Sequence, residues 1–219
     1  MGDLQKSELI TSEAKKSKSW LWIIAGVVWL VTVAMGLHVM LNYSAAAGEP
    51  GQPPAVWPAQ SKIPRTPGLA TIVVLGHPKC PCTRATISEL ALAMARLHDR
   101  ATAVVVLAHP HGTPEHWEET DLWHSASQIP GVIVMGDPDE VETDRFHAQV
   151  SGQTMLYSAN GDLLFSGGIT ASRGHSGDNA GRSSIVSLVL TGTSETKATP
   201  VYGCAMHEPK SSSKSGERH

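Results

Sequence analysis

Residues 70–82 read ATIVVLGHPKCPC, and this stretch decides the fold. The apolar run 70–75 predicts a buried strand, and residues 83–98 carry apolar side chains at helical spacing. Cys80 and Cys82 therefore stand at a turn from a strand into a helix. At such a turn, backbone N–H groups and the helix dipole favour a thiolate. The sequence therefore indicates thiol–disulfide chemistry.

The length and composition of the chain restrict its size class and the other functions that it could have. The chain has 219 residues, which is enough for one domain with appendages. Its formal net charge of −3 gives no electrostatic reason to expect nucleic-acid binding. Three cysteines are too few for a disulfide-stabilised scaffold.

An apolar segment near the N-terminus predicts a membrane helix. Residues 20–41 contain no Asp, Glu, Lys or Arg, and as a helix they span about 33 Å, close to a hydrocarbon core of about 30 Å. Lysines precede the segment closely, and the first charge after it is Glu49. The positive-inside rule then places the N-terminus in the cytoplasm and the main domain outside.

We therefore expect a single-pass protein of the bacterial inner membrane. Residues 1–19 form a cytoplasmic tail, residues 20–43 span the bilayer, and the rest of the chain is periplasmic. The alternative is a cleavable signal peptide, for which Ala45-Ala46-Ala47 fits a cleavage site. Signal-peptide apolar regions are usually about 7–15 residues long, which favours the uncleaved anchor.

The composition also divides the exported part of the chain into three segments. Residues 44–68 contain six prolines and few large apolar residues, which predicts a linker. Residues 69–193 form the predicted domain. Residues 194–219 are a C-terminal extension that includes Cys204, and its last ten residues, KSSSKSGERH, predict a disordered tail.

Strand and helix patterns alternate along the predicted domain, and a hairpin and a last helix follow. Asn160-Gly161 is a strong hairpin signal, and Asp178 is a candidate cap of the last helix. The pattern predicts a three-layer α/β domain with a mixed sheet. The further expected elements are a strand at 101–108, a helix at 113–127, a strand at 131–135, a helix from 137 to about 150, and strands at 153–157 and 163–167.

This order, with paired cysteines after the first strand, resembles the thioredoxin fold. The extra helix and strand in its middle are similar to those of membrane-anchored TlpA/ResA-type redoxins. Three motifs resemble the RedB-like proteins of bacteria more closely. These motifs are GHPKCPC at 76–82, GGITASRGHSGDNAGR at 167–182 and TPVYGCAM at 199–206.

Two features depart from the thioredoxin pattern. The family usually carries Cys-x-x-Cys, whereas this chain has Cys80-Pro81-Cys82, so the alignment leaves open which cysteine is the nucleophile. Aligning residues 151–154 with the segment that carries the family's cis-proline places Gly152 at that position. Because the cis-proline shields the thiols from metals, its absence makes metal binding easier.

We expect Cys80 to be the nucleophile, because the more N-terminal thiol is normally the more exposed. The resolving thiol is Cys82 or Cys204, and His77 and Lys79 tune the acidity of the thiols. A disulfide that closes the small ring of Cys80 and Cys82 would be strained and therefore oxidising. The resemblance implies a protein thiol or disulfide in the periplasm as the partner, and no cofactor.

A copper-binding or metallochaperone domain on the same fold is the alternative, because thiolates and imidazoles suit copper. A non-catalytic membrane interaction module is the third possibility. The alternative metal ligands are Cys80, Cys82, Cys204, His77, His111 and His175.

Overall fold

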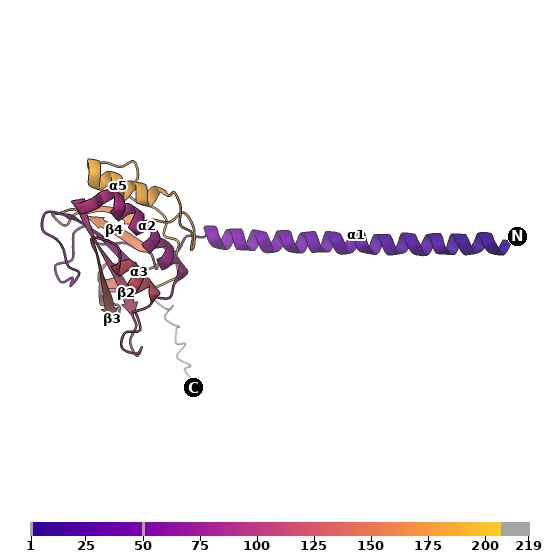
Figure 1. Cartoon of the computed structure of the whole chain (residues 1–219), viewed down its shortest axis with the longest axis horizontal. Helices are drawn as coiled ribbons and strands as arrows, with labels where there is room; N and C mark the ends of the chain where they lie inside the picture. Colours follow the sequence, from indigo (N-terminus) through magenta and orange to yellow (C-terminus); the bar gives the residue numbers. More distant parts are fainter. Residues whose placement is uncertain (1, 50, 207–219) are drawn as a thin grey trace, which may run out of the picture. The chain divides into compact units, whose positions relative to one another are not determined.

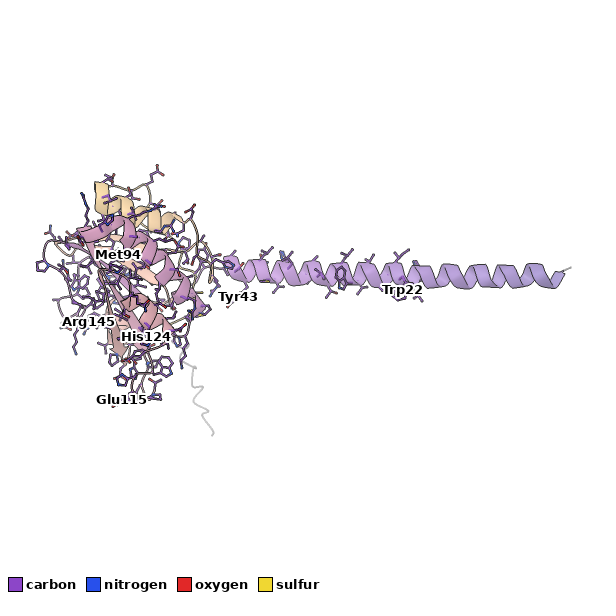
Figure 2. All side chains as sticks on the ribbon, in the orientation of Figure 1. Trp22, Tyr43, Met94, Glu115, His124 and Arg145 are labelled. Carbon is purple, nitrogen blue, oxygen red and sulfur yellow. The ribbon has the colours of Figure 1, made fainter. Side chains whose placement is uncertain are left out.

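The computed structural model describes residues 2–49 and 51–206. The chain divides into two compact units, Met1–Tyr43 and Ser44–His219, and each is described by itself. Helix α1 (Gly2–Ala45) includes an apolar stretch, Trp20–Ala45, with a mean hydropathy of 2.2. By length and composition this stretch could cross a membrane, as the sequence predicts, and a signal sequence would meet the same criteria. Figure 2 labels Trp22 and Tyr43, which lie near its two ends and are exposed.

Five strands of the second unit form one mixed sheet in the order β3-β2-β1-β4-β5. β1, β2 and β3 run parallel, and β4 and β5 are antiparallel to their neighbours. β1 is the central strand because its run of Val, Ile and Leu is buried on both faces. The strands are β1 (Ala70–Gly76), β2 (Ala101–His109), β3 (Val132–Pro138), β4 (Gln153–Tyr157) and β5 (Leu163–Gly167).

Helices α2, α3 and α5 cover one face of this sheet (Figure 1). Apolar residues of these helices form a single core with Ile72 and Val74 of β1, and Met94 of α2, labelled in Figure 2, belongs to this core. The predicted three-layer α/β architecture is confirmed. The helical elements are α2 (Pro81–Leu97), η1 (His98–Arg100), α3 (Asp121–Ser127), α4 (Val141–Arg145) and α5 (Ala180–Thr191).

The proline-rich segment 44–68, predicted to be a linker, helps to cover the other face of the sheet. Trp57 packs edge-on against Phe146 and Tyr157, with ring centroids 5.3 and 5.1 Å apart. Ile63 is only 4% exposed and belongs to the same core. Part of this segment is therefore integral to the folded domain.

The helix predicted over residues 113–127 is shorter than expected. α3 begins only after Thr120, whose side chain accepts a hydrogen bond from the backbone N–H of Leu122 at 3.3 Å. Thr113 does not cap a helix, because its hydroxyl donates to the carbonyl of Pro110. His116 lies between Thr113 and Thr120, and its left-handed φ of 61° also interrupts a helix.

The helix predicted from residue 137 to about 150 is reduced to the five residues of α4. Asp137 still caps it, because its carboxylate accepts from the N–H groups of Glu142 and Thr143 at 2.8 Å each. His147, with φ of 51°, adopts a left-handed conformation after the helix. The helix therefore begins at Val141 and not at residue 137, and it is shorter than predicted.

The cap of α5 is Asn179 and not Asp178, because the side chain of Asn179 accepts from the N–H of Arg182 at 2.7 Å. Asp178 instead forms the i,i+4 ion pair with Arg182 that the sequence permits. Arg182 also binds Glu89 of α2, which is fully buried and accepts from the N–H of Gly177. Glu89 thus joins α2 to the glycine-rich loop before α5. The tail predicted to be disordered, residues 210–219, lies outside the described residues.

Candidate functional site

The site begins where β1 leads into α2. Cys80 is the N-cap residue of α2, with an extended backbone and no side-chain cap of its own. Pro81 occupies the first helical position, where a fixed φ fits the helix and a missing N–H is not needed. The backbone N–H groups of Cys82 and Thr83, in the first helical turn, lower the pKa of the Cys80 thiol.

The C-terminal extension returns to this position. We name residues 201–206 the C-terminal strap. The N–H of Ser151 donates to the carbonyl of Cys204 at 2.8 Å, and the N–H of Met206 donates to the carbonyl of Gln149 at 2.9 Å. Val150 and Ala205 form an antiparallel bridge between these bonds. The strap therefore pairs, as a short strand, with residues 149–151 before β4.

This pairing brings two thiols together that are 124 positions apart in sequence. The sulfurs of Cys80 and Cys204 are 3.5 Å apart. The backbone N–H of Cys204 also lowers the pKa of Cys80. Cys80 is 4% exposed, whereas Cys204 is exposed. The strap thus lies over Cys80 and presents Cys204 to solvent.

A glycine and an arginine hold the strap in this position. A Cβ on Gly203 would lie 1.9 Å from the carbonyl oxygen of Ser151, so only glycine permits this close approach. The guanidinium of Arg173 donates to the carbonyl of Gly203 and to that of Ala46. The carbonyl of the buried Val201 accepts a hydrogen bond from the N–H of Gly48, in the proline-rich segment, at 2.8 Å.

The three thiols differ in acidity. Burial raises the pKa of Cys80, but backbone N–H groups and the Cys204 thiol outweigh burial and bring it from an ordinary 9.0 to about 7. Burial raises the pKa of Cys82, and the nearby Cys80 raises it further, to about 11. Burial and the hydrogen bond with Cys80 also raise the pKa of Cys204, against the charge of Arg173. Near neutral pH, Cys80 is therefore the thiol that ionises most readily.

Gly152 lies directly after the residues that bind the strap. Its N–H donates to the carbonyl of Leu75 at 2.8 Å, and its φ is 91°. A Cβ at this position would lie 2.8 Å from the hydroxyl of Thr86. Glycine therefore suits this position, because it tolerates the positive φ and has no Cβ to clash with Thr86. Residues 2–49 and 51–206 contain no cis peptide bond.

The two predicted tuning residues lie against Trp117. The N–H of His77 donates to the hydroxyl of Ser151, and its ring stands edge-on to Trp117 with centroids 5.2 Å apart. Burial, and then the charge of Lys79, lower the pKa of His77. The Lys79 ammonium lies 4.5 Å above the Trp117 ring. The groups that lower the pKa of Cys80 are backbone N–H groups and the Cys204 thiol, and neither His77 nor Lys79 is among them.

Of the predicted metal ligands, Cys80 and Cys204 lie together, whereas His111 and His175 have other partners. His111 is exposed and pairs with Asp139, and His175 hydrogen-bonds to the carbonyl of Arg173. Within the part of the chain that the structure describes, no group of three or more His, Cys, Asp or Glu side chains could hold a metal ion. The copper alternative stays a prediction.

Two pockets lie near α2. One, of about 300 Å³, adjoins Cys80 and is bordered by the ion pair of Arg84 and Asp121. The other, of about 600 Å³, is more apolar and lies at the C-terminal end of α2, next to Met94 and Ile129. Only the smaller pocket includes a thiol among its lining residues.

Sequence reasoning missed the residues that place Cys204. Ser151 and Arg173 were not identified as site residues, because their contributions depend on backbone contacts with the strap. The pair Gly203-Cys204 was the available signal, since a glycine beside a cysteine suggests close approach to another backbone.

Comparisons with known proteins identify the fold. No protein-family model matches the chain, and no curated protein matches it either. A solved structure of an uncharacterised conserved protein from Geobacillus kaustophilus is 15% identical, with a TM-score of 0.52, and the match covers 76% of this chain and 94% of that one. A hypothetical protein from Sinorhizobium meliloti is 17% identical, with a TM-score of 0.51 and coverage of 74% and 94%.

A secreted disulfide oxidoreductase from Mycobacterium tuberculosis is 16% identical, with a TM-score of 0.37, and the match covers 44% of this chain and 67% of that chain. At sequence identities this low, the structural matches support a shared fold and nothing more. The strand order β3-β2-β1-β4-β5, with β4 and β5 antiparallel to their neighbours, is that of the thioredoxin fold that the sequence predicted. The closer resemblance to RedB-like proteins stays a prediction.

Proposed function

We propose that this protein is a membrane-anchored, extracytoplasmic thiol–disulfide oxidoreductase in which Cys80 and Cys204 form the redox pair. The single observation that carries the proposal is the contact between the two sulfurs, 3.5 Å apart at the start of α2. A disulfide needs an S–S distance of about 2.05 Å, so a small movement of the strap closes it.

The chemistry follows from the different acidities of the thiols. A thiolate is the attacking species in disulfide exchange, and the pKa of about 7 makes Cys80 about half ionised near neutral pH. In the net reaction, the Cys80 and Cys204 thiols become a disulfide while a partner disulfide becomes two thiols, or the reverse. Two electrons and two protons pass between the proteins, and no cofactor is needed.

Cys82 fits the role of the second thiol of the redox pair less well than Cys204. Its pKa of about 11 leaves it protonated at neutral pH, and it is 3% exposed. Cys204, by contrast, is held against Cys80 by two backbone hydrogen bonds of the strap. We therefore assign the redox pair across the fold and not within the Cys-Pro-Cys motif.

The location rests on the N-terminal segment. Trp20–Ala45 is long and apolar enough to span a bilayer, and lysines precede it in the sequence. We propose a single-pass protein of the bacterial inner membrane, with its N-terminus in the cytoplasm and the domain in the periplasm. The partner is a periplasmic protein with a thiol or disulfide.

Peptide mapping of the oxidised full-length protein in detergent tests the redox pair. Oxidation with glutathione disulfide is expected to link Cys80 to Cys204, with Cys82 left free for alkylation. The Cys204→Ser variant should lose this linkage. A wild-type protein that forms only a Cys80–Cys82 disulfide, or none, would contradict the proposal.

A further inference from the structure

The two sulfurs of the redox pair are not equally accessible. Cys80 is 4% exposed and lies beneath the strap, whereas Cys204 is exposed on the strap itself. If the two sulfurs are linked with the strap in place, a thiol that arrives from solvent meets the Cys204 sulfur first.

The strap limits access to Cys80 in both redox states. Backbone hydrogen bonds join the strap to residues 149–151 on both sides of a bridge, and Arg173 holds the carbonyl of Gly203. Gly203 lies so close to Ser151 that no side chain fits between them. The strap therefore covers Cys80 on one side and the pocket beside Arg84 adjoins it on another, but Cys80 is 4% exposed, whereas Cys204 is exposed without any movement of the strap.

The electronic requirements agree with this geometry. In disulfide exchange, the sulfur that leaves most readily is the one whose thiolate is most stable. Backbone N–H groups at the start of α2 stabilise the Cys80 thiolate, whereas burial and Cys80 disfavour the Cys204 thiolate. Attack on Cys204 with departure of Cys80 therefore combines the accessible sulfur with the better leaving group.

We infer that partner proteins form their mixed disulfide with Cys204, the sulfur carried by the strap, and that Cys80 is the leaving thiolate beneath it. This inference rests on the proposed function and assigns its substrate-facing atom. A partner thiolate attacks the Cys204 sulfur of the Cys80–Cys204 disulfide, which forms the partner–Cys204 bond and releases Cys80 as a thiolate. A second partner thiolate then attacks the partner sulfur of this bond, and Cys204 leaves.

The electrons balance in these two steps. The partner dithiol loses two electrons and becomes a disulfide, while the disulfide of this protein gains them and becomes two thiols. The stabilised Cys80 thiolate favours the reduced form of the protein, which makes the disulfide a better oxidant. The partner class is therefore a protein with two thiols that can form a disulfide.

The experiment uses a single-thiol probe on the oxidised full-length protein in detergent. The Cys80–Cys204 disulfide is first verified, and the protein is then mixed briefly with glutathione and quenched with N-ethylmaleimide. Fragment-ion mass spectrometry assigns both adducts. We expect glutathione on Cys204 and N-ethylmaleimide on Cys80, at least tenfold more often than the reverse arrangement.

The same oxidised protein unfolded in guanidinium chloride is the matched control. Both sulfurs are then accessible, so glutathione should attach to Cys80 and Cys204 in similar amounts. Glutathione mainly on Cys80 in the folded protein would overturn this inference and leave the proposed redox pair intact. A protein that forms no Cys80–Cys204 disulfide would overturn both.

Discussion

Replacing Gly203 with alanine tests how the strap positions Cys204. The new Cβ would lie 1.9 Å from the carbonyl oxygen of Ser151, whereas ordinary contacts begin near 3.4 Å. The strap must therefore move by about 1.5 Å at this point, which is enough to break a hydrogen bond.

The size of the effect follows from the bonds that the movement disrupts. Two backbone hydrogen bonds fasten the strap to residues 149–151, at 2.8 and 2.9 Å. At about 1 kcal/mol each, their loss weakens the docking of the strap by about 2 kcal/mol. This corresponds to a decrease of about 30-fold in the equilibrium constant for forming the Cys80–Cys204 disulfide against glutathione.

The assay equilibrates full-length Gly203→Ala protein in detergent with glutathione buffers and measures the disulfide fraction by alkylation and mass spectrometry. Ala205→Ser is the matched control, since Ala205 is exposed on the same strap and its backbone pairing is unchanged. A Gly203→Ala protein with a disulfide equilibrium within twofold of wild type would refute the reasoning.

Four further predictions concern acidity and stability, all in the full-length protein in detergent. Alkylation of Cys80 by iodoacetamide should rise with pH around a midpoint near 7, whereas Cys82 should react only above about pH 10; equal midpoints would contradict the pKa values of about 7 and about 11. Because the pKa of Cys80 lies below its ordinary 9.0, the thiolate should add stability to the reduced protein as pH rises from 7 to 9, and urea denaturation at both values should show this gain relative to Cys80→Ser. Glu89→Gln should lower the free energy of unfolding by about 3 kcal/mol, because it removes the buried carboxylate that pairs with Arg182 and leaves only the exposed Asp178; a loss under 1 kcal/mol in urea denaturation would argue against this. Trp57→Ala should cost about 3 kcal/mol if the proline-rich segment belongs to the core, whereas a linker residue would cost less than 0.5 kcal/mol by the same measurement.

The sequence predicted the elements whose signals are local. The strand at 70–75 and the hairpin strands at 153–157 and 163–167 agree with β1, β4 and β5. In these segments a few neighbouring residues suffice, because apolar runs predict buried strands and Asn-Gly predicts a tight turn. The turn from β1 into α2, with Cys80 at its end, was predicted for the same reason.

Local signals failed where a distant contact decided the structure. The helix expected from Thr113 begins after Thr120, whose hydroxyl also donates to the carbonyl of Pro78 beside the thiols. The proline-rich composition of residues 44–68 was typical of a linker, yet Trp57 fills a space between two aromatic rings far along the chain. No short window of sequence contains either partner.

The sequence by itself determined that two cysteines stand at the start of a helix after a central strand, because hydrophobic periodicity and helix-start chemistry act over a few residues. Only the tertiary structure decided which thiol faces Cys80. The neighbour is Cys204, brought there by backbone pairing with residues 149–151 and by a glycine that permits close approach. Such pairing depends on where separate strands lie in space, and the glycine beside Cys204 indicates a close approach without identifying the backbone that it meets.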